Sequence, residues 1–208
     1  MVSQTSRKLR RSFYNRPTLE ICRDILGMHI VFQGERGTMS GRIVEVEAYI
    51  GEDDPACHAS VGRTARSAIM YGPPGYSYIY FIYGMYYCLN FVTEREGFPA
   101  AILLRAAEPV WGIEFMAHTA RAADSRILSG PGMFCRAFGL TKEQNGLDLT
   151  VGPLYLEDRG TGVKHIECSP RVGIRKGSDR VWRFYDAESP SVSVAKGSVK
   201  GLEGTGKG

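Results

Sequence analysis

The sequence predicts a single domain that contains both strands and helices. Its 208 residues suffice for one well-buried domain, and 43% hydrophobic with 23% charged residues is an ordinary globular composition. Strand-like runs at 43–50 and 100–107 flank a tyrosine-rich hairpin, and helix-like runs lie before and after them. We find no internal repeat, and we expect residues 17–196 to form one unit.

The two ends of the chain differ from this domain in composition. Residues 1–16 carry Arg7, Lys8, Arg10, Arg11 and Arg16 without an acidic residue. We expect a flexible basic arm there, which either touches phosphate or only solubilises the chain. Residues 197–208 are rich in glycine and are predicted to be disordered.

Charge and cysteine content narrow the functional classes. A net charge of +4 and a pI near 8.8 are compatible with nucleic acid or another phosphorylated partner. The five cysteines are widely spaced without a CxxC, and Cys57 and His58 point apart on an extended chain, so we expect no disulfide scaffold, metal site or cofactor. No run has the length of a signal peptide or membrane span, so we expect a cytoplasmic, nucleoid-associated protein without a membrane partner.

Local patterns predict the elements outside the hairpin. Proline begins and Gly27 ends an amphipathic run over 17–27, which is typical of a helix. Strands are expected at 29–32, 39–50 and 153–158, and helices at 110–126 and 133–140. The basic segment 170–185 reads as one further strand or a pair of strands.

The run 43–50 places Glu45, Glu47 and Tyr49 on one face of a strand and apolar residues on the other. On pattern alone, such carboxylates are as often solvated surface as functional. The run 100–107 is apolar except for Arg105, which indicates a strand buried on both faces. Because a buried guanidinium needs an anion, Arg105 is expected to pair with Glu47, Glu45 or a ligand phosphate.

Seven of the eleven tyrosines lie between Tyr71 and Tyr87, in a segment that reads as strand, turn and strand. Most aromatic rings of such a hairpin are usually buried in the hydrophobic core. Tyr83 is expected at the exposed tip, where a large ring gains nothing unless it inserts into a partner such as DNA with unstackable base steps.

Two further features lie beside these runs. The loop 51–75 is long for a compact domain and contains His58, with Arg63 and Arg66 adding positive charge. A lone loop histidine is more often incidental than functional. Residues 129–132 precede a helix, whose start is either a simple cap or a phosphate site.

Taken together, EVEAY with a histidine nine residues past the tyrosine, YIYFIYGMYYCLN and ILLRAAEP resemble the alkyladenine (3-methyladenine) DNA glycosylase family. SGPGMFCRAFGL and PRVGI resemble that family too, in the same order, so the resemblance covers about residues 10–195. It implies an α+β fold, a single mixed domain around a curved antiparallel β-sheet with a protruding β-hairpin.

The resemblance also implies roles for individual residues. Glu47 matches the general base for the attacking water, and Arg105 matches the arginine that helps to hold this water. The remaining matches are the base pocket (Tyr49, His58 and Tyr80), the purine-screening side chain (Asn90) and the wedge that intercalates into DNA (Tyr83).

The chemistry of such an enzyme needs these residue types. An alkylated purine is already cationic and leaves without a proton, so one carboxylate suffices where ordinary glycosidases use two. None of the three central runs contains a lysine, so a Schiff base is not expected and the reaction is hydrolysis.

The sequence therefore predicts a monomeric, monofunctional DNA glycosylase. It would flip out and excise 3-methyladenine, 7-methylguanine, hypoxanthine or ethenoadenine from double-stranded DNA containing a damaged base, initiating base excision repair. A non-catalytic protein that recognises flipped bases and a free-nucleoside hydrolase are the alternatives. Glu47 with Arg105 argues against the first, and the basic arm with Tyr83 argues against the second.

Overall fold

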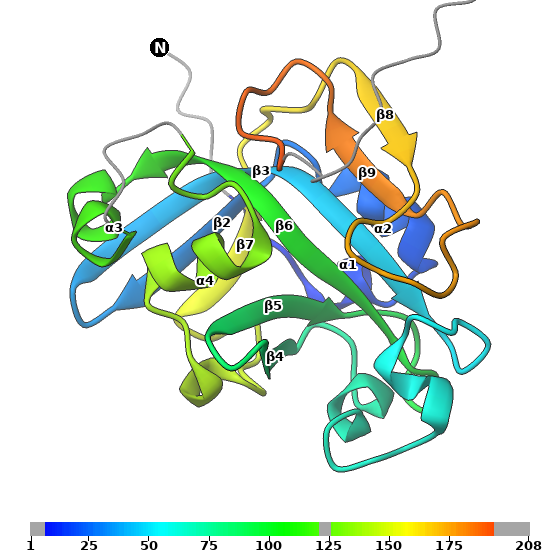
Figure 1. The fold of residues 1–208 in the computed structure, drawn as a ribbon. Helices are drawn as coiled ribbons and strands as arrows, with labels where there is room; N and C mark the ends of the chain where they lie inside the picture. The colour runs from blue at the N-terminus through cyan, green and yellow to red at the C-terminus, as the bar shows by residue number, and fades with distance from the viewer. Residues whose placement is uncertain (1–6, 121–125, 194–208) are drawn as a thin grey trace, which may run out of the picture.

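The computed structural model describes residues 7–120 and 126–193, shown as a ribbon in Figure 1. Its strands are β1 (Arg7–Lys8), β2 (His29–Gly34), β3 (Gly37–Ile50), β4 (Ser77–Ile82), β5 (Tyr86–Val92), β6 (Ala100–Trp111), β7 (Leu154–Asp158), β8 (Ile166–Ser169) and β9 (Arg183–Asp186). The helices are α1 (Arg11–Tyr14), α2 (Thr18–Asp24), α3 (Ile113–Ala120) and α4 (Pro131–Phe138), with short 3₁₀ helices η1 (His58–Val61), η2 (Ala68–Tyr71) and η3 (Lys142–Gln144).

These strands form one antiparallel sheet in the order β1-β7-β2-β3-β6-β5-β4. The long strand β3 organises it, because its first half pairs with β2, its second half pairs with β9, and β6 runs along its other edge. Strand β8 adds to β9. The α+β class and the single open antiparallel sheet expected from the sequence are confirmed.

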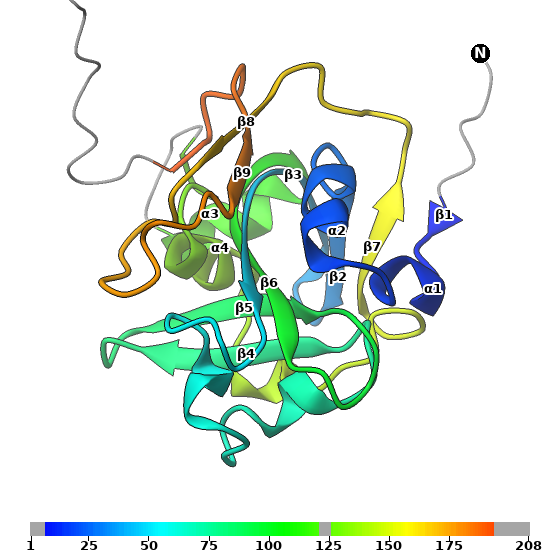
Figure 2. The same cartoon turned by 90° about the vertical axis from the view of Figure 1, so that its right-hand side faces the viewer.

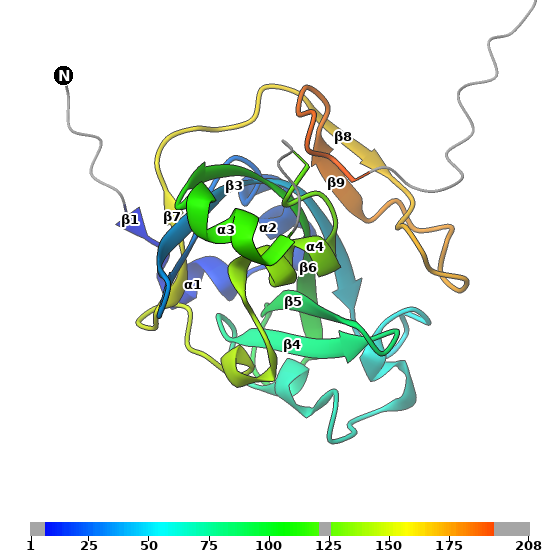
Figure 3. The same cartoon turned by 60° about the vertical axis from the view of Figure 1, so that its left-hand side comes forward.

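Helices cover both faces of this sheet. In Figure 1, α3 and α4 lie in front of it and α1 and α2 behind, and the view from the side in Figure 2 separates the two layers. Fully buried rings fill the core, among them Phe91 of β5 and Phe134 and Phe138 of α4. Figure 3 shows the β4–β5 hairpin, which forms the end of the sheet, below α3 and α4.

The β4–β5 hairpin projects from the body of the domain (Figure 2). The Met85 amide donates to the Ile82 carbonyl, and Tyr83 (φ 55°) and Gly84 (φ 67°) both have positive φ between them. Two positive φ values at the centre of a turn are typical of a type I′ turn, which matches the twist of the flanking strands. Tyrosine rarely adopts this conformation, so the turn holds Tyr83 under local strain.

A bulge interrupts the pairing of β3 with β6 near its middle. Ile43 lies opposite Ala107, Glu45 opposite Ala106 and Val46 opposite Leu104, so Val44 and Arg105 are left out of the register. Bulges bend a strand and redirect the side chain of the extra residue. This one places the side chain of Arg105 beside the two glutamates of β3.

Three parts of the chain differ from the sequence expectations. Strand β6 continues to Trp111, where helix 110–126 was expected, because Gly112 (φ 70°) separates the strand from α3. Residues 170–182 contain no strand, since Gly173 and Gly177 both take positive φ. Only β9, preceded by β8, forms the strand pair in this region.

The expected basic arm is the third difference. Residues 7–16 belong to the domain, since β1 pairs with β7 and Tyr14 is fully buried. Arg11 and Arg16 form ion pairs with Asp148 and Asp24. An arm was expected because the charges are dense, whereas their acidic partners lie elsewhere in the chain. Residues 1–6 and the expected disordered tail at 197–208 lie outside the described residues.

Candidate active site

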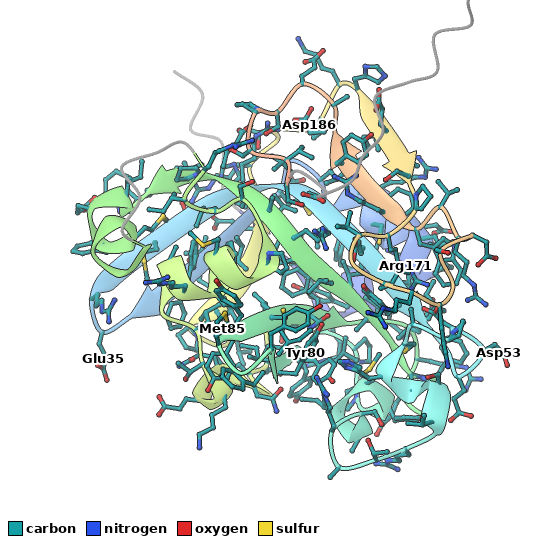
Figure 4. All side chains as sticks on the ribbon, viewed as in Figure 1. Glu35, Asp53, Tyr80, Met85, Arg171 and Asp186 are labelled. Carbon is teal, nitrogen blue, oxygen red and sulfur yellow. The ribbon has the colours of Figure 1, made fainter. Side chains whose placement is uncertain are left out.

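A cavity of about 430 Å³ opens on the front of the sheet. Its walls come from the hairpin, the His58 loop, the start of α4 and the loop before β9, which are far apart in the sequence. Figure 4 shows two of these elements, with Tyr80 labelled on the hairpin and Arg171 on the loop before β9. The lining includes Tyr49, His58, Met70, Tyr78, Tyr80, Ile82, Tyr83, Tyr86, Cys88, Asn90, Leu103, Arg105, Gly130, Pro131, Met133, Val172 and Ile174. A space of this size is right for a small, flat, largely apolar ligand.

Glu47 and Arg105 meet at the inner end of this cavity. Arg105 Nη1 lies 3.2 Å from Glu47 Oε1, and Glu47 is fully buried. The Tyr49 hydroxyl donates to Glu47 Oε2 at 2.8 Å, and the Val172 amide donates to Oε1 at 2.7 Å. All three of these neighbours line the cavity, so Glu47 lies directly behind its wall. The Arg105–carboxylate pairing expected from the sequence is confirmed.

Glu45 has a different environment although it is equally buried. Its Oε1 accepts hydrogen bonds from Arg105 Nε, Arg183 Nε and Ser193 Oγ, and its Oε2 accepts one from the Ser193 amide. Of these partners, only Arg105 lines the cavity. Glu45 therefore acts as an anchor for two guanidinium groups, and the solvated surface considered for both glutamates is excluded.

Three partners for Arg105 were expected from the sequence, namely Glu47, Glu45 or a ligand phosphate, and the structure pairs it with both glutamates. Nε of the guanidinium is bonded to Glu45, and Nη1 faces Glu47. Each carboxylate oxygen has about two lone pairs. Among the described residues, Glu47 Oε2 accepts one hydrogen bond, from the Tyr49 hydroxyl, and it keeps capacity for a further donor such as a water molecule.

Aromatic rings form the walls of the cavity. The rings of His58 and Tyr80 lie edge to face with centroids 4.5 Å apart, and His58 Nδ1 pairs with the Tyr78 hydroxyl at 2.7 Å. Burial, with a smaller contribution from the Arg66 cation, lowers the pKa of His58 to about 4. The imidazole is therefore neutral at physiological pH. Burial and the neighbouring Glu47 raise the pKa of Tyr49, which stays a hydroxyl donor.

Asn90 lines the cavity, and Leu89 beside it is buried in the core, as strand alternation predicts. The Asn90 amide nitrogen donates to the backbone carbonyls of Tyr78, at 2.9 Å, and Cys88, at 3.4 Å. Because the backbone occupies both donors, Oδ1 is the atom of this side chain that can meet a ligand.

Tyr83 lines the mouth of the cavity from the tip of the hairpin, where it is 78% exposed. Phe81 and Met85 beside it are 50% and 64% exposed. Exposed apolar side chains therefore cluster on this projecting turn, as is typical of surfaces that contact a partner.

The loop before β9 supplies residues that the sequence patterns did not single out. Arg171 and Asp54 are both fully buried and form a bidentate ion pair with distances of 2.5 and 2.7 Å. The Arg171 guanidinium also lies over the rings of Tyr49 and Trp182. This pair fixes the loop so that the next residue, Val172, reaches Glu47 with its backbone amide. A backbone donor has no side-chain signature, so only the PRVGI resemblance pointed to this segment.

Two arginines of the His58 loop, which were expected to add positive charge near the site, lie on aromatic rings. The Arg66 guanidinium lies 4.9 Å from the centroid of Tyr80, a wall of the cavity. Arg63 lies 5.7 Å from the centroid of Tyr71, which is not part of the lining. Arg66 thus contributes positive potential to the cavity, whereas Arg63 contacts a ring outside its lining.

The start of α4 forms the remaining rim. Gly130 and Pro131 line the cavity, and the Gly130 amide donates to the Arg105 carbonyl at 2.9 Å. No side chain caps this helix. Across the described ranges, no cluster of three or more histidine, cysteine or acidic side chains is suited to a metal ion. None of the helices in these ranges is long and apolar enough to cross a membrane.

Comparison with known proteins agrees with this geometry. Residues 12–190 match the family model for methylpurine-DNA glycosylase. A protein of Methanocella arvoryzae named "Putative 3-methyladenine DNA glycosylase" is 53% identical over 191 residues, covering 89% of this chain and 95% of its own. Proteins of the same name from the Wolbachia of Brugia malayi and from Alkaliphilus oremlandii are 47% and 43% identical, covering 85% and 89% of this chain and 95% and 98% of their own. The chain therefore belongs to the methylpurine-DNA glycosylase family.

Proposed function

We propose that this protein is a monofunctional glycosylase that flips a damaged purine out of duplex DNA and hydrolyses its N-glycosidic bond. The observation that carries the proposal is the position of Glu47, a buried carboxylate bonded to three groups that line a base-sized aromatic cavity. Family membership supports the same class of reaction.

The Glu47 carboxylate accelerates the attack of water on the sugar, which is slow without a base. In the proposed reaction, Glu47 Oε2 takes a proton from a water molecule as its oxygen bonds to C1′ of the sugar and the C1′–N bond breaks. The bonding pair leaves with the purine, so a cationic alkylated base departs as a neutral molecule without an acid. Glu47 also stabilises the oxocarbenium-like sugar electrostatically. Arg105 holds the carboxylate in place and helps to orient the water.

The cavity walls suit a planar base. Tyr49, Tyr80 and His58 offer ring surfaces, and stacking on electron-rich rings favours the electron-poor ring system of an alkylated purine. Neutral His58 forms a hydrogen bond with the edge of the base and adds no second positive charge beside a cationic base. We propose 3-methyladenine and 7-methylguanine as substrates, which leave as neutral bases, and also hypoxanthine and ethenoadenine, whose departing anions take a proton from water.

Entry of the base requires opening of the duplex. Unstacking and unpairing cost a few kcal/mol, less for a damaged base, and a side chain that takes the vacated place offsets part of this cost. Tyr83 is exposed, lines the cavity and lies at the tip of the projecting hairpin, so we assign it this wedge role. Asn90, which lines the cavity and is tied to the backbone through its amide nitrogen, is the proposed steric screen against the exocyclic amino group of normal guanine.

The composition of the cavity lining supports simple hydrolysis. No lysine lines the cavity among the described residues, which argues against a Schiff-base intermediate. We propose that the protein acts as a monomer on damaged double-stranded DNA, associated with the nucleoid.

The test uses duplexes that each contain one defined lesion. We expect release of the free purine and formation of an alkali-labile abasic site, without a borohydride-trapped protein–DNA adduct. Binding to lesion duplexes without release of any base would instead establish a non-catalytic reader of flipped bases. Equal hydrolysis of the corresponding free nucleosides would establish a nucleosidase.

A further inference from the structure

Ser193, close to the end of the described chain, contacts the charged groups behind the cavity with all its polar atoms. Its amide donates to Glu45 Oε2 at 2.6 Å, and its hydroxyl donates to Glu45 Oε1 at 2.8 Å. The same hydroxyl accepts a hydrogen bond from Arg105 Nη2 at 3.0 Å. Its carbonyl accepts one from Arg183 Nη2 at 3.2 Å. Ser193 is 8% exposed and lies beyond residue 190, where the match to the family model ends.

These contacts fix the plane of the Arg105 guanidinium. Nε is bonded to Glu45 and Nη2 to Ser193, so one edge of the group is held at two points. The remaining nitrogen, Nη1, then faces Glu47 at 3.2 Å. A planar guanidinium held at two points on one edge has a fixed direction for its other donors.

The charges around Ser193 balance without it. Glu45 and Glu47 supply two negative charges, and Arg105 and Arg183 supply two positive ones. Both arginines donate through Nε to the same oxygen, Glu45 Oε1. Electrostatic attraction alone therefore does not fix the orientation of the Arg105 guanidinium. A neutral hydroxyl that bridges Arg105 and Glu45 supplies direction without changing the net charge.

We propose that Ser193 is a positioning residue, which aims Arg105 at Glu47 and so sets where the attacking water binds. This inference rests on the proposed function for its catalytic consequence, but its structural consequence is independent of activity. The segment that leads to Ser193 is thereby part of the active site, although it lies outside the cavity lining.

The test compares Ser193→Ala, Ser193→Thr and Ser169→Ala in the full chain. Ser169 is a matched control, because its hydroxyl accepts a hydrogen bond from Arg183 Nη1 in the same cluster and does not touch Arg105. Single-turnover release of a lesion base measures chemistry. The Kd for a duplex whose lesion nucleotide carries a hydrolysis-resistant 2′-fluoro sugar measures binding. Exchange of the Arg105 Nε proton with solvent, followed by NMR on the free protein, reports the orientation of the guanidinium.

We expect Ser193→Ala to slow base release about ten-fold, as for loss of a hydrogen bond to a charged group, with Kd changed less than two-fold. Exchange at Arg105 Nε should become faster. Ser193→Thr should restore both properties, and Ser169→Ala should leave both near wild type. An unchanged release rate in Ser193→Ala, an equal loss in Ser169→Ala, or a parallel loss of binding would each overturn the inference. If the wild type releases no base at all, the proposed function fails, and Arg105 exchange still decides whether Ser193 orients it.

Discussion

The Tyr49 hydroxyl donates a 2.8 Å hydrogen bond to Glu47 Oε2, so a ring in the cavity wall is bonded to the buried carboxylate behind it. Both residues lie on the same face of β3, two positions apart. Any base stacked on this ring is therefore held at a fixed distance from the carboxylate. The proposed general base and one ring of the cavity wall therefore lie on the same strand, and substitutions at the two positions separate their contributions.

Glu47→Gln should bind lesion duplexes about as well as wild type and lose base release by roughly 10³-fold, since general base catalysis typically contributes 10²–10⁴-fold. The amide keeps the volume of the side chain and cannot accept the water proton. Tyr49→Phe is the matched control. It keeps the ring and loses only the donor, so we expect a fall of about ten-fold. Single-turnover release and duplex binding are the measurements, and near-normal turnover by Glu47→Gln would refute the assignment of the base.

Tyr83→Ala should impair opening of the duplex more than cleavage of the bond. We expect activity on a stably paired hypoxanthine to fall by about ten-fold or more, with a smaller loss when the same lesion sits in a mismatch that already opens easily. Val151→Ala is the control, because Val151 is 75% exposed and does not line the cavity. Equal losses on the paired and mismatched lesions would show that Tyr83 is not a wedge.

Asn90→Ser should relax discrimination against normal guanine. A shorter side chain leaves room for the exocyclic amino group that adenine and hypoxanthine lack, and specificity built by repulsion is lost when the repelling group is removed. The assay is release of guanine from undamaged duplex, with hypoxanthine release as the control for folding. A variant that releases hypoxanthine normally and still ignores guanine would exclude Asn90 as the screen.

Arg66→Gln should shift the preference between cationic and neutral lesions. Its guanidinium lies 4.9 Å from the Tyr80 ring and opposes a positive charge in the cavity. We expect release of 7-methylguanine relative to hypoxanthine to rise by roughly five-fold, given partial screening by solvent and salt. Arg63→Gln, in the same loop but on Tyr71, should leave the ratio unchanged. If both variants lost activity equally on 7-methylguanine and hypoxanthine, the two arginines would act only through contacts with DNA phosphate.

His58 and His29 should make stability depend on pH between about 6.5 and 4. Burial lowers the pKa of each from 6.5 to about 4, so the unfolded chain takes up protons first as the pH falls. Their contribution to stability is thus complete above pH 6.5 and is lost as the pH falls towards 4. Thermal melts of His58→Gln and His29→Gln should each show a flatter pH dependence. Only His58→Gln should change base release, because His29 lies outside the cavity. If the melting temperature of both variants depended on pH as it does in the wild type, this account would be contradicted.

Several features of the protein follow from its sequence alone. Alternation over 43–50 placed Glu45, Glu47 and Tyr49 on one face, and the apolar run around Arg105 required a buried counter-ion. The tyrosine-rich segment with Gly84 at its turn predicted the hairpin and its exposed tip. These features depend on short-range periodicity and on the cost of burying charge, both of which can be read without knowing where distant segments lie.

Tertiary structure decided how the two glutamates differ. The pattern treats Glu45 and Glu47 alike, and only the folded chain brings the Ser193 amide, 148 positions away, to Glu45 and the Val172 amide, 125 positions away, to Glu47. The same holds for Arg11, whose partner Asp148 turned an expected free arm into part of the domain. Hydrogen bonds and ion pairs between distant segments leave no periodic trace in the sequence, because their geometry is set by the packing of the whole sheet and its helices.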